Sequence, residues 1–470
     1  MNLRAAIALM LCLALTACVR FDGIAPSEAK RDIPASVTDT AFRAWPEIEW
    51  WKNYQDPALN DLIAHALADS PRIRIAAARL RAAQAVTTFV GAKRLPQVEV
   101  DAQSKWQRFS EHGFSPPDLA GGHESDNRFA FDASYELDLF GKNRSAHEAT
   151  QAQVVAAVAS THAARLALTS AVARLYFQLG RYCAEREVAR ATRTQRAKIL
   201  ELVKARVAEG VDSNVELRQA EGAIPRIEGE LAELEERISL LRNALAILTV
   251  VEPNATATLT PSLIHALKPT LPALIPSDLV ARRPEVEVAR WRVEAGLKGI
   301  ESVRAEFYPS INLSAFAGLS ALGIGALFEG GSQIYGIAPV IRLPIFDADR
   351  LRAKLKFVDA QTDVSIAEYN RALGRAIKDV LDAVTSIRAL TQRQVAQRAA
   401  QQAAQSAYDL ALQRFKAGLT GYLTVLTTES EVLIERRAAA DLNARAYELD
   451  VSLARALGGG FDAEATLARN

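Results

Sequence analysis

Residue types that carry out catalysis are sparse and scattered in this chain of 470 residues. No two of the six histidines stand four positions apart, as paired zinc ligands on one helix face do. The sequence has no Gly-x-x-x-x-Gly-Lys-Ser/Thr loop to cradle a phosphate and no Gly-x-Ser-x-Gly turn to expose a nucleophilic serine. We therefore expect no enzyme activity, no metal and no cofactor.

Three carboxylates, Asp132, Glu136 and Asp138, lie close enough in sequence to suggest an acid–base cluster. Their positions are all even-numbered, within a stretch that alternates polar and apolar residues. In a strand, alternate side chains point to the same face. A solvated strand face is the favoured interpretation, and a carboxylate site is the alternative.

Cys18 has the clearest chemical role. Arg4 and an uncharged apolar run, Ala5–Leu15, precede it, and that run is too short to span a bilayer. Ala17 followed by Cys18 resembles the processing box of bacterial lipoproteins, which implies cleavage before Cys18 and lipidation of its thiol and new amine. A plain secretory signal with an incidental cysteine is the alternative.

The residue after this cysteine is Val19 rather than aspartate, which by the sorting rules of lipoproteins favours the outer membrane. Cys12 leaves with the signal peptide, residues 1–17. Once Cys18 is acylated, Cys183 has no partner for a disulfide. We expect Cys183 to be a small buried hydrophobic residue.

The composition excludes several classes of protein. Hydrophobic residues make up 49% and charged residues 24%, so the chain is neither disordered nor an ordinary multi-helix membrane protein. The net charge is +1, which provides no basic field for binding nucleic acid.

The chain contains two copies of one plan. Leu95–Val98 corresponds to Tyr308–Ile311, and Arg206–Gly210 corresponds to Arg414–Gly418, at a separation of about 210 residues. Two further blocks match in the same order. We expect a duplicated domain, with these parts: a lipidated segment 18–55, a first repeat 56–250, an equatorial linker 251–276, a second repeat 277–457 and a tail 458–470.

Each repeat is dominated by one very long helix, expected over residues 142–209 and 349–417. Neither stretch contains proline, and about 68 residues extend ~100 Å at the α-helical rise. Apolar residues at alternating three- and four-residue steps over 224–248 and 366–387 predict coiled-coil packing. Pro225 should kink or delay the first of these. Shorter helices are expected over 56–93, 212–250, 277–306 and 420–457, two of them packing end to end against each long helix to make a rod.

Four segments are predicted to be strands: about 97–108, 128–140, 309–320 and 332–346. Residues 128–139 alternate cleanly, with Phe129 and Phe131 on one face and Asp132 on the other. Such strands suit an outer-membrane barrel, apolar toward lipid and polar toward the lumen, although a sandwich strand gives the same pattern. The uncharged stretch 307–328 is long enough for a membrane helix, but its proline and glycines favour a strand and loop. Four strands cannot close a barrel, so the chain must associate; two copies would give eight strands and three would give twelve.

Several motifs together resemble the TolC-like outer-membrane efflux proteins, in the NodT-like lipoprotein branch. They are Trp50–Leu59, Tyr135–Gly141, Ala281–Val286 and Arg414–Gly418, and the resemblance covers nearly everything from Trp50 to Gly458. It implies an α+β membrane channel: a homotrimeric 12-stranded β-barrel in the outer membrane, continued by a 12-helix coiled-coil α-barrel through the periplasm.

The same resemblance implies a passive export duct of a tripartite efflux system for drugs or other small toxic molecules. Its partners would be a periplasmic adaptor and an inner-membrane pump, which in the family is commonly proton-driven. Nucleic acid is not expected as a partner. A periplasmic coiled-coil scaffold or adaptor lipoprotein is the alternative. An adaptor would show one helical hairpin flanked by split β-segments, whereas this chain shows two hairpins and two strand pairs.

The turns after Gly210 and Gly418 are expected to form the periplasmic tip, because glycine favours the left-handed conformation that ends a helix. By position, the resemblance implies a gate leucine at Leu423, with the family's acidic positions falling on Thr424 and Thr427 in the second half and on Glu216 in the first. The two threonines depart from the family's acidic pattern. A seam leucine is the alternative role of Leu423, and a capping box with Ser213 is the alternative role of Glu216.

Overall fold

The computed structural model describes residues 24–32, 36–41, 47–113, 117–263, 273–276, 283–345 and 348–461. The chain divides into two compact units. Unit 1 takes its described residues from 24–30, 79–158 and 288–370, and unit 2 takes them from 31–78, 159–287 and 371–461. Cys18 and the predicted signal peptide lie outside the described residues, as does most of the predicted tail.

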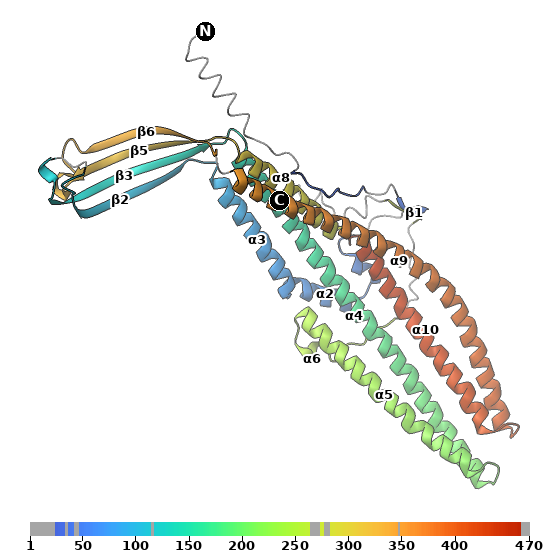
Figure 1. Ribbon diagram of the computed structural model, residues 1–470. Helices are drawn as coiled ribbons and strands as arrows, with labels where there is room; N and C mark the ends of the chain where they lie inside the picture. Colours follow the sequence, from blue (N-terminus) through green and yellow to red (C-terminus); the bar gives the residue numbers. More distant parts are fainter. Residues whose placement is uncertain are drawn as a thin grey trace. The chain divides into compact units, whose positions relative to one another are not determined.

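Helices make up most of the described chain (Figure 1). The two longest, α4 (Lys142–Ala208) and α9 (Ala348–Lys416), match the expected long helices to within one residue at each end and run from unit 1 into unit 2. The remaining α-helices are α2 (Pro57–Asp69), α3 (Pro71–Ala92), α5 (Asn214–Thr249), α6 (Pro253–Thr256), α8 (Pro284–Ala305) and α10 (Tyr422–Ala456). Short 3₁₀ turns are η1 (Trp50–Tyr54), η2 (Pro117–Leu119) and η3 (Ile324–Ala326).

The helix predicted over 56–93 is wrong as a single element, because the chain breaks it between α2 and α3. Ser70 has an extended conformation, with φ −60° and ψ 127°. The ring of Pro71 clashes with a helical residue before it, so Ser70 is forced out of the helix and α3 starts afresh at Pro71. By contrast, α5 continues through Pro225.

The sheet of unit 1 contains four antiparallel strands in the order β2-β3-β5-β6. The strands are β2 (Gln97–Arg108), β3 (His123–Leu137), β5 (Ser310–Leu322) and β6 (Gln333–Arg342). β3 starts five residues before the predicted strand and stops before Leu139, where Gly141, at φ +78°, turns the chain into α4. β2 and β6 each have one edge without a strand partner among the described residues.

Two further strands were not anticipated. β1 (Ser36–Ala41) pairs antiparallel with β4 (Ala273–Pro276), with Thr38 opposite Ile275. This small sheet joins the N-terminal segment to the stretch that links the repeats, within unit 2. Short strands with such distant partners leave little periodic signal in a sequence.

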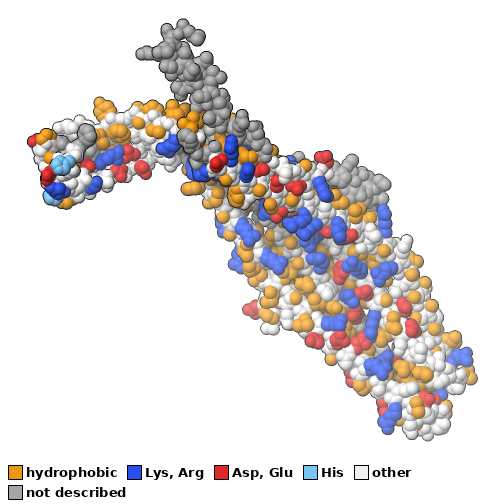
Figure 2. Space-filling model, viewed as in Figure 1, with side chains coloured by type: hydrophobic (Ala, Val, Ile, Leu, Met, Phe, Trp, Pro, Cys, Tyr) orange, Lys and Arg blue, Asp and Glu red, His pale blue; other side chains and the backbone are white. Residues whose placement is uncertain are grey.

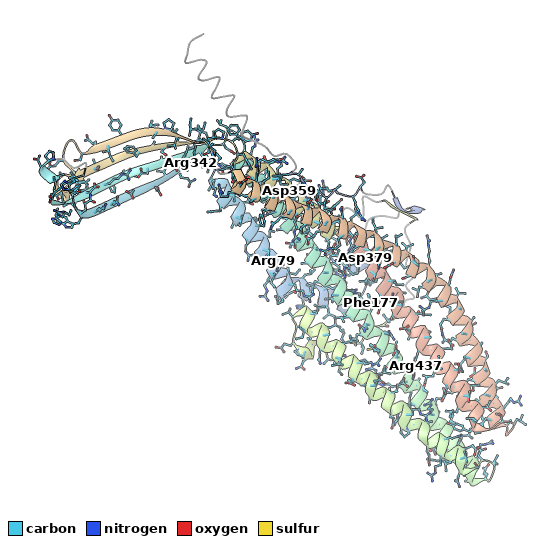
Figure 3. All side chains as sticks on the ribbon, viewed as in Figure 1. Arg79, Phe177, Arg342, Asp359, Asp379 and Arg437 are labelled. Carbon is cyan, nitrogen blue, oxygen red and sulfur yellow. The ribbon has the colours of Figure 1, made fainter. Side chains whose placement is uncertain are left out.

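The core of unit 2 gathers around α4. Phe177, labelled in Figure 3, packs with Tyr447 of α10 at a ring-centroid distance of 4.6 Å. Trp50 and Trp51 of η1 are almost completely buried in the same cluster. Cys183 is a free, buried thiol there, as predicted, and burial raises its pKa. Part of α4 is apolar and long enough to cross a membrane by length and composition, but several of its apolar side chains pack in this core.

Candidate functional site

The sheet of unit 1 has two chemically different faces. Across all four strands the register aligns Val100, Phe131, Ala317 and Tyr335 on one face. Phe131 is 54% exposed and Tyr335 85% exposed, so the described residues form no layer that covers the large apolar side chains on this face. A bare apolar face of this size requires an apolar environment.

The opposite face is polar where it belongs to β2 and β3. Arg128 donates to Asp101 at 3.0 Å and, through both terminal nitrogens, to Asp132 at 2.7 and 2.8 Å. Lys142 forms an ion pair with Glu136. Asp132 and Glu136, two of the three carboxylates predicted to line a wet strand face, are therefore held in surface ion pairs, and the charged side chains of the sheet gather over β2 and β3 in Figure 2. Asp138, the third, lies just after the end of β3, where its carboxylate accepts from the Arg144 N–H at 2.7 Å.

In unit 2 the helices form two hairpins: hairpin 1 is α4 with α5, and hairpin 2 is α9 with α10 (Figure 1). Gly210 ends α4 and Gly418 ends α9, each with φ +74°. The two turns make the same pair of hydrogen bonds. After α4, the Gly210 N–H donates to the Val207 carbonyl and the Val211 N–H donates to the Arg206 carbonyl. After α9, the Gly418 N–H donates to the Phe415 carbonyl and the Leu419 N–H donates to the Arg414 carbonyl. Both are Schellman caps, which need a left-handed residue at this position. The structure thus has matching turns at the two predicted positions.

Hairpin 1 restarts at a complete capping box. The Ser213 hydroxyl accepts from the Val215 N–H at 3.1 Å, while the Glu216 carboxylate accepts from the Ser213 N–H at 2.9 Å. The Ser213 hydroxyl also bonds to Glu216, and these bonds lower the pKa of the Glu216 carboxyl. The structural role predicted for Glu216 as an alternative is therefore present, with the carboxylate ionised.

Hairpin 2 restarts at Gly421, which offers no side-chain cap. Leu423 in the first turn of α10 is 60% exposed. Thr424 and Thr427 are exposed on the same side of the helix, and their hydroxyls take part in local bonds: Thr420 donates to Thr424 Oγ1, and Thr427 donates to Leu423 O at 2.9 Å. The Leu423 side chain is thus left uncovered by the described residues of the single chain. Among the described residues, Glu216 and Leu423 bond locally and not to one another.

Arg206 clamps the two turns together. Its guanidinium forms a bidentate pair with Asp212, at 2.8 and 3.0 Å, and donates to the Phe415 carbonyl of α9 at 2.9 Å. The same group lies 4.5 Å over the Phe415 ring. One side chain at the end of α4 therefore holds both its own turn and the end of α9.

Deeper in the bundle, Glu429 of α10 is buried and charged. Its carboxylate accepts from Arg196 Nε at 2.8 Å and from Gln195 Nε2 at 2.9 Å, and both of these partners belong to α4. The side chains of Arg196 and Glu429 are only 7% and 4% exposed. This ion pair joins hairpin 2 to hairpin 1.

An apolar cluster surrounds these two polar links: Ile199, Val203, Ala220, Tyr408, Phe415, Tyr422, Val425 and Val432. Burial raises the pKa of Tyr408 and Tyr422 to about 12, so both phenols stay protonated at physiological pH. On α10 the buried residues follow steps of three and four, which leaves Leu423, Thr424 and Thr427 on the opposite, exposed side.

Sequence reasoning located the turns but missed the polar links between the hairpins. Arg206 lies in the repeated block that ends at Gly210, although its counterpart Arg414 forms no such clamp within the part of the chain that the structure describes. Glu429 stands where the spacing of Tyr422, Val425 and Val432 calls for an apolar residue. A charge at such a position is a signal for a buried ion pair, but its partner cannot be named from one sequence.

Known proteins share this architecture and sequence. The chain matches the family described as outer membrane efflux protein over residues 62–249 and again over 275–459. The multidrug resistance outer membrane protein MdtQ of Escherichia coli O157:H7 is 30% identical over 441 residues, covering 91% of this chain and 92% of the relative. Among solved structures, the outer membrane protein VceC of Vibrio cholerae is 34% identical with a TM-score of 0.83, covering 89% of this chain and all of VceC. The outer-membrane channel OprN is 25% identical with a TM-score of 0.85, covering 95% of this chain and all of OprN.

Proposed function

This chain belongs to the outer membrane efflux protein family, and we propose that three copies assemble into a duct that carries drugs or other small toxic molecules out of the cell. The family and the relatives establish an outer-membrane export channel of α+β fold rather than an enzyme. The number of copies, the cargo, the gate, the lipid and the particular partners are the proposal.

The sheet supports the proposed assembly. β2 and β6 each present an edge that no described strand of the chain pairs with, and in lipid every backbone N–H and C=O must be satisfied within protein. Pairing β6 of one chain with β2 of the next removes both edges. Two copies would close eight strands, whose interior is filled by side chains, while three copies close twelve and leave a lumen. A duct requires the lumen, which favours the trimer.

The exposed side of α10 supports a gate at the tip. Three copies of Leu423 around a common axis would form an apolar ring that excludes water and hydrated solutes. Thr424 and Thr427 would add neutral hydroxyls rather than charges to that ring. Any acidic contribution would come from Glu216 of hairpin 1, whose carboxylate is ionised and already engaged in its capping box.

The sequence features around Cys18 support a lipid anchor in the outer membrane, with the helical hairpins extending into the periplasm. As the outer-membrane part of a tripartite system, the trimer would receive cargo from a periplasmic adaptor and an inner-membrane pump, which we propose to be proton-driven. The two family matches, one in each half of the chain, support the proposed duplication over 56–250 and 277–457.

The single observation that carries this function is a sheet that is apolar on one face, polar over β2 and β3 on the other, and without a strand partner at either edge among the described residues. The test is dye export in a bacterial host that lacks its own efflux channels and is supplied with this chain, its adaptor and its pump. We expect ethidium accumulation to fall relative to the host without the chain. Unchanged accumulation, with the chain assembled in the outer membrane and its partners present, would contradict the export role.

A further inference from the structure

Residues 24–30 form an extended segment laid along α8 and α9 of unit 1. Ile24 is buried against Phe307 and Leu351, in a cluster completed by Ile300, Val303 and Leu355. Phe307 lies three residues before β5, and Leu351 lies nine residues after β6. This end of the segment is therefore fixed where the four-stranded sheet gives way to helices.

Polar contacts hold the rest of the segment. The carboxylate of Asp363 on α9 accepts from the Ser27 hydroxyl at 2.8 Å and from the Glu28 N–H at 2.9 Å. Both bonds stabilise the ionised carboxylate and lower its pKa. Asp359, labelled in Figure 3 one helical turn earlier on α9, makes no hydrogen bond to the described residues of the segment.

Three more contacts fix both ends of the segment. Arg304 of α8 donates to the Ile24 carbonyl at 3.1 Å, and Asn370 of α9 donates to the Ala29 carbonyl at 2.9 Å. Lys30 forms an ion pair with Glu294 of α8 at 2.7 Å. Six contacting groups along seven residues are far more than a passing connection requires, since an unanchored terminus is normally poorly ordered.

We propose that residues 24–30 are a tether that holds the lipid-bearing N-terminus beside the end of the sheet, so that the lipid enters the membrane where the strands must insert. Only five residues lie between Cys18 and the buried Ile24, and the six residue steps from one to the other span at most about 20 Å in a fully extended chain. The lipid is thereby confined to the neighbourhood of the strand ends. This inference rests on the proposed lipidation of Cys18.

A tether of this kind has a kinetic consequence. An anchor fixed near the strand ends keeps the unpaired strands close to the membrane surface and so raises their effective concentration there. A short linker between two binding modules has the same effect on the second module. A loose anchor would hold the chain to the membrane without placing its sheet. We therefore expect the tether to speed trimer formation without being needed for acylation.

The test measures the rate at which heat-resistant trimer appears in outer membranes after a pulse of synthesis of the full chain. Asp363→Ala removes both acceptors of the tether, and Glu28→Pro removes one donor without touching α9. Glu28→Pro should slow trimer formation about fivefold, the factor that corresponds to one net hydrogen bond, and Asp363→Ala, which loses two, should slow it more. The matched control is Asp349→Ala, which removes a fully exposed carboxylate from the first turn of α9 and should leave the rate unchanged.

The same variants in a Cys18→Ser chain separate a tether from ordinary packing. If the segment acts through the lipid, Asp363→Ala should add little to the slowing that loss of the lipid already causes. Equal slowing with and without the lipid, or wild-type rates for both tether variants, would overturn the tether. Incorporation of labelled palmitate is measured in parallel: its absence from the wild-type chain would remove the lipid anchor itself, an outcome distinct from failure of the tether.

Discussion

At the scale of single residues, two kinds of side chain point to function: an apolar side chain that the single chain leaves exposed, and a charged side chain that it buries. Leu423 is exposed at the tip although it is apolar, and Glu429 is buried although it is ionised in a pair with Arg196. An exposed leucine on a helix whose opposite side is packed favours a contact with another copy. A buried ion pair between two hairpins fixes their relative position within the bundle.

Replacing Leu423 by serine should widen the resting tip. The apolar ring would be lost while the packed side of α10 stays intact, so the trimer should still form. We expect higher conductance in planar bilayers and greater entry of a large antibiotic such as vancomycin into cells. The control is Leu419→Ser, an equally exposed leucine in the preceding turn. A well-assembled Leu423→Ser trimer with wild-type conductance would remove Leu423 from the gate.

Cross-linking tests whether the Leu423 positions of neighbouring copies lie close together. Cys183 is buried with a raised pKa, so an engineered Leu423→Cys thiol should be far more reactive than Cys183. If three copies converge, oxidation should join two chains through residue 423, because a disulfide requires Cα atoms within about 7 Å. Val211→Cys, an exposed position on hairpin 1, is the comparison and should cross-link poorly. Equal yields at both positions would argue against convergence at Leu423.

Truncating Glu429 to alanine should loosen the tip. It leaves the Arg196 charge buried without its partner, and breaking a buried ion pair in this way costs about 3–5 kcal/mol. Hydrogen exchange at the amides in the first turns of α10 should quicken, while amides near the buried Tyr447 stay protected. Glu431→Ala, an exposed carboxylate two residues further on, should leave exchange unchanged. Matching exchange in the two variants would show that the pair does not hold the hairpins together.

At the scale of elements, the four strands act through their alternation. A one-residue shift in any strand would exchange its two faces, so register and function are inseparable here. Phe131 lies near the middle of β3 on the apolar face, and Ser134 lies on the polar face of the same strand.

Arginine placed on each face tests this assignment. Phe131→Arg would expose a charge to lipid, at a cost of about 2–4 kcal/mol near the bilayer midplane, and should sharply reduce the yield of trimer. Ser134→Arg would place the same charge toward the lumen and should be tolerated. The comparison is made on outer-membrane fractions by gel, without heating. Equal yields from the two variants would mean that the facing is misassigned.

The elements that could be predicted from the sequence are those that a local residue pattern specifies. The long helices, the four strands of the main sheet and the turns at Gly210 and Gly418 all follow from periodicity, proline and glycine, which act over a few residues. The pairing of β1 with β4, the Arg206 clamp and the tether onto Asp363 join residues far apart in sequence. Such contacts depend on the tertiary arrangement, so one sequence contains no direct trace of them. The break at Ser70 was readable from Pro71, and the prediction of one helix there gave too much weight to the flanking apolar residues.

At the scale of the whole molecule, the chain is incomplete by itself. Its described residues leave two strand edges unpaired and an apolar sheet face bare. Both are satisfied together only if copies close into a barrel in the membrane, and only a barrel larger than eight strands leaves a passage for cargo. Assembly of the copies, insertion into the membrane and formation of the duct therefore occur together.

The mass of the detergent-purified assembly tests this account most directly. Native mass spectrometry of the full-length, membrane-extracted protein should give a single species of three chains, each carrying the added mass of its lipid. The trimer should persist on dilution, because separating the chains exposes backbone edges as well as apolar surface. A folded monomer, or a dimer as the stable species, would contradict the twelve-stranded duct.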